Sequence, residues 1–148
     1  MKVKLKDEME TLLIPLYGRA QMSGRGLFSD EWAEEAVRRI DYDFSRLRIQ
    51  EKTQVMLSVR GRMIDAFAAD YLKEHPGSTV VYLGCGLDAR FLRMGSPDVL
   101  WYDLDFPDVI EIKKQLYPET ERYRLIPSSV TDWDWMERVD TNGKPVLV

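Results

Sequence analysis

Two glycines and two nearby carboxylates are the residues of this sequence best placed to do chemistry. Gly84 and Gly86 follow an apolar run, and Asp103 and Asp105 close a second apolar run about twenty residues later. Glycines let the backbone turn sharply and approach a ligand, and a carboxylate at the next strand tip can accept hydrogen bonds from both hydroxyls of a ribose. The pattern is typical of the nucleoside-binding half of a Rossmann-like sheet.

Either of the two acids could hold the ribose. Asp105 is the favoured ligand, and Asp103 is the alternative. Pro107 begins a predicted helix directly afterwards, so a helix-capping role is the other interpretation of these side chains.

Asp88 discriminates between nucleoside ligands. It lies where the helix after the first predicted strand begins, and a dinucleotide would place its pyrophosphate there. A carboxylate in that position disfavours a phosphate but is compatible with an ammonium group. S-adenosylmethionine has an α-ammonium group and no phosphate, so Asp88 favours it over a dinucleotide. A plain N-cap is the alternative role.

Arg60 and Arg62 lie on the predicted helix before the first strand, where one of them could clamp a carboxylate. A solvated helix face is the alternative interpretation. The single cysteine, Cys85, and the single histidine, His75, cannot form a typical zinc or iron site, so no metal is predicted. Cys85 is interpreted as a small packing residue inside the turn.

Two regions must position these residues. Residues 1–75 are predicted to be a mostly helical cap, and residues 76–148 follow the alternating pattern of an α/β fold. In the helical region, Pro15 is expected to bend or split the first helix, and Ser29 is expected to cap the second. A third helix is predicted over roughly residues 54–73.

The second region contains four apolar runs that predict strands, at residues 79–83, 99–104, 123–126 and 145–148. Right-handed connections then give a parallel sheet with the strand order 3-2-1-4. The fourth strand would lie at an open, apolar edge, so we expect further strands and helices in a longer parent protein. We therefore interpret residues 76–148 as the first half of a Rossmann-like domain, truncated after its fourth strand.

The composition narrows the choice of partners. The 148 residues carry a formal net charge of −4, which gives no support to nucleic-acid binding through bulk electrostatics. No apolar run approaches the length of a transmembrane helix, and the N-terminus lacks the apolar core of a signal peptide. One cysteine excludes an internal disulfide and fits a reducing compartment. The sequence thus predicts a cytoplasmic protein that binds neither membranes nor nucleic acids.

Several longer motifs, in this order, resemble the leucine carboxyl methyltransferase family, which includes the tetracenomycin-type polyketide O-methyltransferases. The motifs are TLLIPLYGRA, VRGRMIDAF, LGCGLDAR, WYDLDFPDVI and PETERYRLIPSSVTDWDWM. The resemblance implies a class I fold that binds S-adenosylmethionine and transfers its methyl group to a carboxylate or related oxygen of a small molecule or peptide terminus. One departure is Ala89, which replaces the threonine usual in the GCGLDTR motif.

The resemblance also implies roles for individual residues. Arg60 would bind the methionyl carboxylate, and Arg19 is a second candidate near the same end of the cofactor. The other implied contacts are Gly84 and Gly86 along the cofactor, Asp105 at the ribose, and Ser129 and Val130 beside the adenine. The resemblance assigns no catalytic residue within this chain.

Two other interpretations stay open at this point. The stretch from Gly84 to Ala89 formally fits G-x-G-x-x-A, the pattern of NAD-dependent oxidoreductases, although Asp88 and the long helical region before the first strand disfavour it. Alternatively, the chain is an incomplete fragment without activity of its own. The methyl acceptor and the oligomeric state are not readable from the sequence.

Overall fold

The computed structural model describes residue 3, residues 10–26 and residues 28–148, and its order of elements has the α/β class predicted from the sequence. The helices are α1 (Glu10–Met22), α2 (Glu31–Arg39), α3 (Glu51–Glu74), α4 (Arg90–Arg93) and α5 (Pro107–Leu116), with 3₁₀ helices η2 (Phe44–Arg46) and η3 (Trp133–Arg138). The strands are β1 (Thr79–Leu83), β2 (Leu100–Asp105), β3 (Tyr123–Pro127) and β4 (Val146–Leu147).

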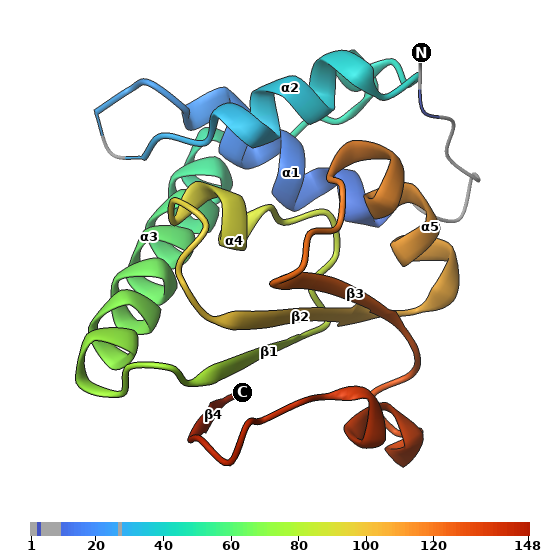
Figure 1. The fold of residues 1–148 in the computed structure, drawn as a ribbon. Coiled ribbons are helices and arrows are strands. Elements are labelled where there is room, and N and C mark those ends of the chain that lie inside the picture. The colour runs from blue at the N-terminus through green and yellow to red at the C-terminus, as the bar shows by residue number, and fades with distance from the viewer. Residues whose placement is uncertain (1–2, 4–9, 27) are drawn as a thin grey trace.

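The four strands form one parallel sheet in the order β3-β2-β1-β4, which confirms the predicted order. Leu83 pairs with Leu104, so the carboxyl ends of β1 and β2 lie side by side. β4 is shorter than its apolar run predicts, because only Val146 and Leu147 pair with β1. The sheet therefore brings the glycine turn after β1 next to the acidic end of β2 (Figure 1).

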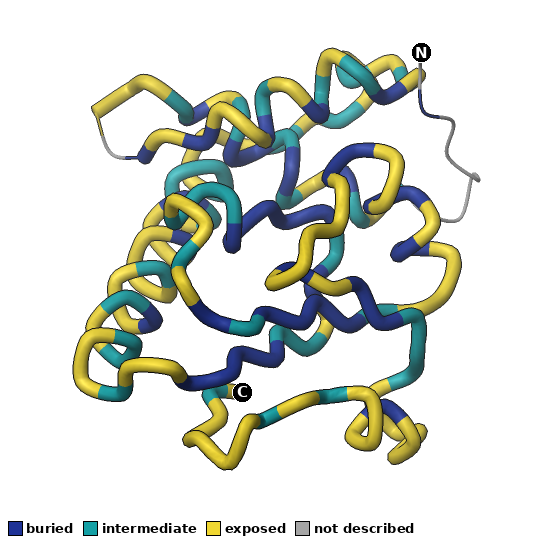
Figure 2. Tube along the Cα trace, viewed as in Figure 1, coloured by how far each residue is buried: buried dark blue, intermediate teal, exposed yellow. Residues whose placement is uncertain are grey.

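The main core lies between the sheet and the helices on one of its faces. Figure 1 shows α1, α2, α4 and α5 gathered on one side of the strands, while β4 forms the edge of the sheet beside β1. Leu13 of α1, Ile110 of α5 and Trp101 of β2 are almost completely buried there. Figure 2 shows that buried residues run along the central strands of the sheet. A smaller cluster packs Leu104 against Trp135 of η3 on the opposite face. Burial on both faces explains why the strands are continuous apolar runs.

Two helix boundaries differ from the sequence-based expectation. α1 runs unbroken through Pro15 rather than splitting there, and its buried Leu13 and Leu16 anchor it on both sides of the proline. The N-cap of α2 is Asp30, not Ser29: the Asp30 side chain accepts a hydrogen bond from the Ala33 backbone N–H at 3.0 Å. Both residue types favour caps, and the tertiary contacts of Asp30 described below select it.

Two small residues allow the close packing that sets the positions of two arginines. A Cβ atom on Gly18 of α1 would lie 2.9 Å from Leu57 Cδ1 of α3, so a larger residue would have to displace the Leu57 side chain. Gly61 of α3 is also buried. Because Gly18 and Gly61 adjoin Arg19 and Arg60 in sequence, the α1–α3 contact brings these arginines to the same region.

The outer face of α3 contributes little to the core. Met56, Met63 and Phe67 are each more than half exposed. Among the helices of the described part of the chain, none is both long enough and apolar enough to cross a membrane. The helix therefore serves the site through its inner face, which carries the buried Gly61 and Ala68.

Candidate functional site: a pocket at the carboxyl ends of β1 and β2

A pocket of about 200 Å³ lies where β1 and β2 end. Its walls come from α1, α3, the end of β1, the glycine turn and the tip of β2. The lining residues that can contribute chemistry are Arg19, Arg60, Tyr82, Gly84, Gly86, Asp88 and Asp105. The structure thus brings together most of the cofactor-binding residues that the sequence predicted.

The turn after β1 needs its glycines for backbone conformation. Gly84 and Gly86 have φ angles of 61° and 52°, in the left-handed region that side chains with a Cβ atom disfavour. Space is not the constraint, because a Cβ atom placed on Gly84 would meet no other atom within 4 Å. Cys85 between them is buried, and burial raises the pKa of its thiol to about 12. The buried position agrees with the packing role that the sequence suggested.

Asp105 closes the pocket on the β2 side. Its Oδ2 atom accepts a hydrogen bond from the Gly86 backbone N–H at 2.7 Å, and its Oδ1 atom accepts one from the Phe106 backbone N–H at 2.8 Å. Each carboxylate oxygen has a second lone pair for a ligand hydroxyl. The carboxylate is therefore fixed across the glycine turn with accepting capacity left over.

Asp103 lies elsewhere, and the structure does not place it in this pocket. It shares a face of β2 with Asp105 but lies one pleat further from the strand end, under α5. The buried carboxylate accepts hydrogen bonds from Tyr123 Oη at 2.6 Å and Trp101 Nε1 at 2.9 Å, and it pairs with Lys113 Nζ at 2.7 Å. Asp103 therefore has a structural role beneath the turn.

Lys113 is a residue that the sequence analysis missed. Burial lowers the pKa of its ammonium group, but the neighbouring Asp103 carboxylate outweighs that effect and holds the pKa well above its ordinary value. Its Nζ also donates to the Asp88 backbone carbonyl at 2.7 Å and so ties the glycine turn to α5. The spacing in the sequence could have indicated that Lys113 is buried, because Lys113 lies on the same helical face as the apolar residues Val109 and Leu116, which are buried.

Replacing Lys113 by methionine is expected to lower the free energy of unfolding by about 3 kcal/mol, because Asp103 would stay buried without its ion-pair partner. Urea denaturation measures this change. The matched control is Lys114→Met on the exposed side of the same helix, which should change stability by less than about 0.5 kcal/mol. Equal losses in the two variants would contradict the role assigned to Lys113.

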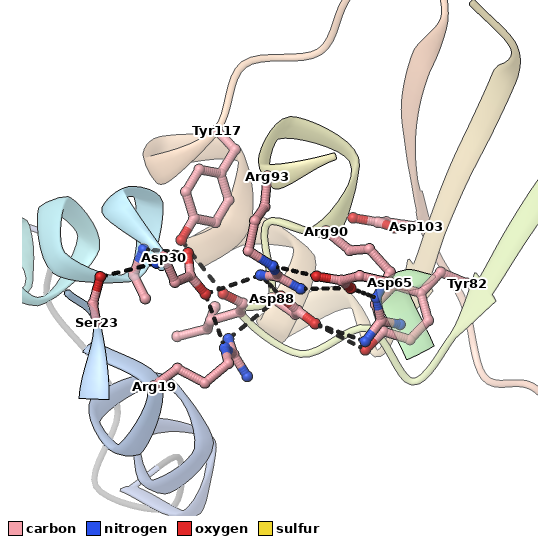
Figure 3. Close-up of polar contacts among 12 residues, drawn as sticks. Arg19, Ser23, Asp30, Asp65, Tyr82, Asp88, Arg90, Arg93, Asp103 and Tyr117 are labelled. Carbon is pink, nitrogen blue, oxygen red and sulfur yellow. Dashed lines mark hydrogen bonds and ion pairs between the residues drawn. The ribbon is translucent and has the colours of Figure 1, made fainter. Parts of the chain in front are cut away.

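A group of charged residues extends from the pocket, where it includes Arg19 and Asp88, and we call it the charge cluster. It comprises Arg19, Asp30, Asp65, Asp88, Arg90 and Arg93 (Figure 3). Arg93 lies at its centre, with Nη1 2.7 Å from Asp88 Oδ1 and 2.9 Å from Asp30 Oδ2, and Nε 2.7 Å from Asp65 Oδ2. Three arginines balance three aspartates, so the cluster is neutral while joining α1, α2, α3 and α4 to the glycine turn.

Asp88 is the carboxylate that most of the cluster shares. Its Oδ1 contacts Arg93 and Arg19, and its Oδ2 contacts Arg90 at 3.3 Å and accepts a hydrogen bond from Tyr82 at 3.2 Å. Burial raises the pKa of Asp88, but the three guanidinium ions outweigh burial and hold the pKa well below its usual range. Asp88 is thus the anchor of the cluster; the N-cap of α4 is Ala89, so a plain cap is not its role.

The remaining predicted residues lie along the same edge of the sheet. Arg60 is exposed at the pocket, and the structure shows no hydrogen bond or ion pair between its side chain and any other described residue. Ser129 and Val130 follow the end of β3 and are outside the pocket lining, and Val130 is 43% exposed. Phe106, which the sequence analysis did not single out, is 61% exposed directly after Asp105.

The parallel sheet, with its glycine turn after β1 and a carboxylate at the tip of β2, defines an α/β protein of the Rossmann-like class. The chain belongs to the leucine carboxyl methyltransferase family, whose family model matches residues 5–143.

Individual relatives agree with this assignment. The chain is 45% identical to the tetracenomycin polyketide synthesis O-methyltransferase TcmP of Streptomyces glaucescens, over 99% of this chain and 55% of the relative. It is 32% identical to the S-adenosyl-L-methionine-dependent methyltransferase dpfgK of Gibberella zeae, again over 99% of this chain and 55% of the relative. The chain therefore spans about half the length of these curated relatives.

Proposed function

We propose that this chain carries the S-adenosylmethionine site of an O-methyltransferase. The observation that carries the proposal is the pocket in which Asp105, the glycine turn, Arg19 and Arg60 meet. Its two ends offer opposite chemistry, because Asp105 accepts hydrogen bonds and the arginines donate them. A ligand with a ribose at one end and a free carboxylate at the other matches this arrangement. The family membership and the names of both relatives support the same cofactor.

The adenosine end of the proposed ligand lies toward β2 and β3. Asp105 accepts hydrogen bonds from the two ribose hydroxyls while Gly86 holds its carboxylate in place. Beyond the ribose, the exposed Phe106 offers a stacking surface for the adenine, and Ser129 and Val130 border it from the end of β3. We retain these two residues as adenine contacts on this basis.

The methionyl end lies toward the helices. Arg60 and Arg19 form a two-arginine clamp for its carboxylate, to which guanidinium groups donate strong charge-assisted hydrogen bonds. In this arrangement the helices α1 and α3 act as a cap that closes the pocket over the Rossmann-like domain 76–148.

We place the protein in the cytoplasm because the single, buried cysteine of this chain fits a reducing compartment.

The same geometry argues against the NAD-dependent alternative. A dinucleotide places its pyrophosphate at the N-terminus of the helix after the glycine turn. Here that helix, α4, has only four residues, and the Asp88 carboxylate lies directly before it. Three arginines surround this carboxylate, and their charges are already balanced by aspartates of the cluster. A pyrophosphate would therefore meet a neutral, occupied network.

S-adenosylmethionine held by Asp105, Arg19 and Arg60 would supply a methyl group activated by the sulfonium, and its transfer to an acceptor oxygen would break the methyl–sulfur bond and leave S-adenosylhomocysteine. The residues of this chain need only bind and orient the cofactor. Good positioning of the reacting groups can lower the activation free energy by about 7–11 kcal/mol. We propose a carboxylate or related oxygen of a small molecule or peptide terminus as the acceptor, with a polyketide as the small molecule suggested by TcmP. An ionised carboxylate needs no general base, whereas a hydroxyl acceptor would need one.

Calorimetric titration of the chain with S-adenosylhomocysteine, with NAD as the control, tests the proposed cofactor. We expect micromolar binding of S-adenosylhomocysteine and no binding of NAD. Binding of NAD alone would overturn the proposal. Binding of neither would support the alternative that the 148 residues are an incomplete fragment.

Replacing Arg60 by glutamine is expected to weaken S-adenosylhomocysteine binding about tenfold, because a charge-assisted hydrogen bond contributes about 1.5–3 kcal/mol. The same titration measures the loss. The matched control is Lys52→Gln, an exposed cation on the same helix that does not line the pocket. Unchanged affinity in the Arg60 variant would remove this residue from the proposed clamp.

A further inference from the structure

Arg19 belongs both to the pocket and to the charge cluster. Among the described residues that line the pocket, Arg19 is the one arginine of the charge cluster. Its Nε donates to Asp30 Oδ2 at 3.1 Å, and its Nη2 lies 3.5 Å from Asp88 Oδ1. A guanidinium group has five N–H donors, so these two contacts leave donors for a ligand carboxylate. The position of these donors depends on the two carboxylates that bind the Arg19 guanidinium, those of Asp30 and Asp88.

Asp30 is the nearer of these two carboxylates and the more firmly fixed. Its side chain is completely buried. Its Oδ1 accepts from the Ala33 backbone N–H at 3.0 Å as the N-cap of α2, and its own backbone N–H donates to Ser23 Oγ at 2.9 Å. Both ends of the residue are therefore held, and Oδ2 is left pointing at Arg19 and Arg93 (Figure 3).

The other carboxylate cannot replace Asp30. Asp88 Oδ1 lies 2.7 Å from Arg93 but 3.5 Å from Arg19, so Arg93 is its closer partner. Without Asp30, the long side chain of Arg19 would gain rotamers in which its guanidinium no longer faces the ligand. Ordering it again on binding would weaken the affinity for the ligand carboxylate.

We propose that Asp30 is a positioning residue that acts through Arg19 to orient the donors for the methionyl carboxylate of the cofactor. This inference rests on the proposed function. It assigns a role in cofactor binding to the N-cap residue of α2, a helix that does not itself line the pocket.

The test compares two ligands that differ in the carboxylate. S-adenosylhomocysteine carries the whole amino-acid portion, whereas 5′-methylthioadenosine keeps the adenosine and the sulfur but lacks that portion. Asp30→Asn keeps an oxygen that can cap α2, since asparagine is as good an N-cap as aspartate, but it removes the charge that holds Arg19. Dissociation constants are measured by calorimetry for both ligands.

The matched control is Asp65→Asn. This change also removes a carboxylate from the charge cluster, one that is 17% exposed, but Asp65 contacts Arg90 and Arg93 and not Arg19. General damage to the cluster should therefore occur in both variants, whereas selective loss of carboxylate binding should occur only in Asp30→Asn. A third variant, Arg19→Met, is combined with Asp30→Asn to test whether the two residues act together.

We expect Asp30→Asn to raise the dissociation constant of S-adenosylhomocysteine about tenfold and that of 5′-methylthioadenosine less than about twofold. Asp65→Asn should leave the ratio of the two constants unchanged, and Asp30→Asn should add nothing to Arg19→Met. Parallel weakening of both ligands by Asp30→Asn, or the same selectivity in Asp65→Asn, would overturn the inference. Wild-type protein that binds both ligands equally would overturn it while leaving the adenosine site intact. Binding of neither would overturn it together with the proposed function.

Discussion

Asp88→Asn is expected to lower the free energy of unfolding by about 5 kcal/mol, because three buried arginines would lose a carboxylate that they share. The substitution keeps the size of the side chain, so the loss reports the missing charge rather than a cavity. Urea denaturation measures it. The matched control is Asp70→Asn on the exposed part of α3, where a change of less than about 0.5 kcal/mol is expected.

The same residue predicts the acid sensitivity of the fold. The low pKa of Asp88 in the folded protein means that, below about pH 4, the unfolded chain takes up a proton that the folded chain does not. The stabilisation from Asp88 is therefore fully present above that pH and is lost as the pH falls toward the folded-state pKa. Asp88→Asn should lose less stability than the wild type between about pH 5 and pH 3. Parallel pH profiles would contradict the assignment of Asp88 as the charged anchor.

Asp105→Ala is expected to weaken S-adenosylhomocysteine binding about 100-fold. The proposed complex loses two charge-assisted hydrogen bonds to the ribose, together about 3 kcal/mol or more. Binding of 5′-methylthioadenosine should fall equally, because that ligand keeps the ribose. Calorimetry on both ligands thus separates Asp105 from the arginines, whose variants should affect S-adenosylhomocysteine alone.

The control for Asp105→Ala is Glu111→Gln, an exposed acid on the neighbouring helix α5. The melting temperature of the Asp105 variant should stay close to that of the wild type, since water can replace the carboxylate at Gly86 and Phe106 on the pocket rim. An alanine variant that binds both ligands normally would remove Asp105 as the ribose ligand.

The parts of the site that could be predicted from the sequence are those with a local cause. The left-handed turn requires Gly84 and Gly86 wherever the chain goes next, and a right-handed β–α–β unit must bring Asp105 beside that turn. The same rule gave the strand order, which the structure confirms. These features depend on short stretches of chain and on the handedness of the backbone, and both are readable from residue order.

Tertiary packing decided which of two similar residues takes each role. Asp103 and Asp105 are both acids at the end of one strand, but only tertiary packing places Lys113 against Asp103 and leaves Asp105 at the pocket. Ser29 and Asp30 are both good caps, and the contact of Asp30 with Arg19 selects the second.

The sequence alone determined the fold class, the glycine turn and the carboxylate at the next strand tip, because local backbone conformation and strand handedness dictate them. The tertiary structure alone decided that Arg19, Asp30, Asp65, Asp88, Arg90 and Arg93 form one neutral cluster. These residues come from four helices and a turn, and burial forces their charges to pair once the helices pack. The spacing of these residues along the chain does not predict their pairing, because the charges meet only when elements distant in sequence pack against each other and exclude water.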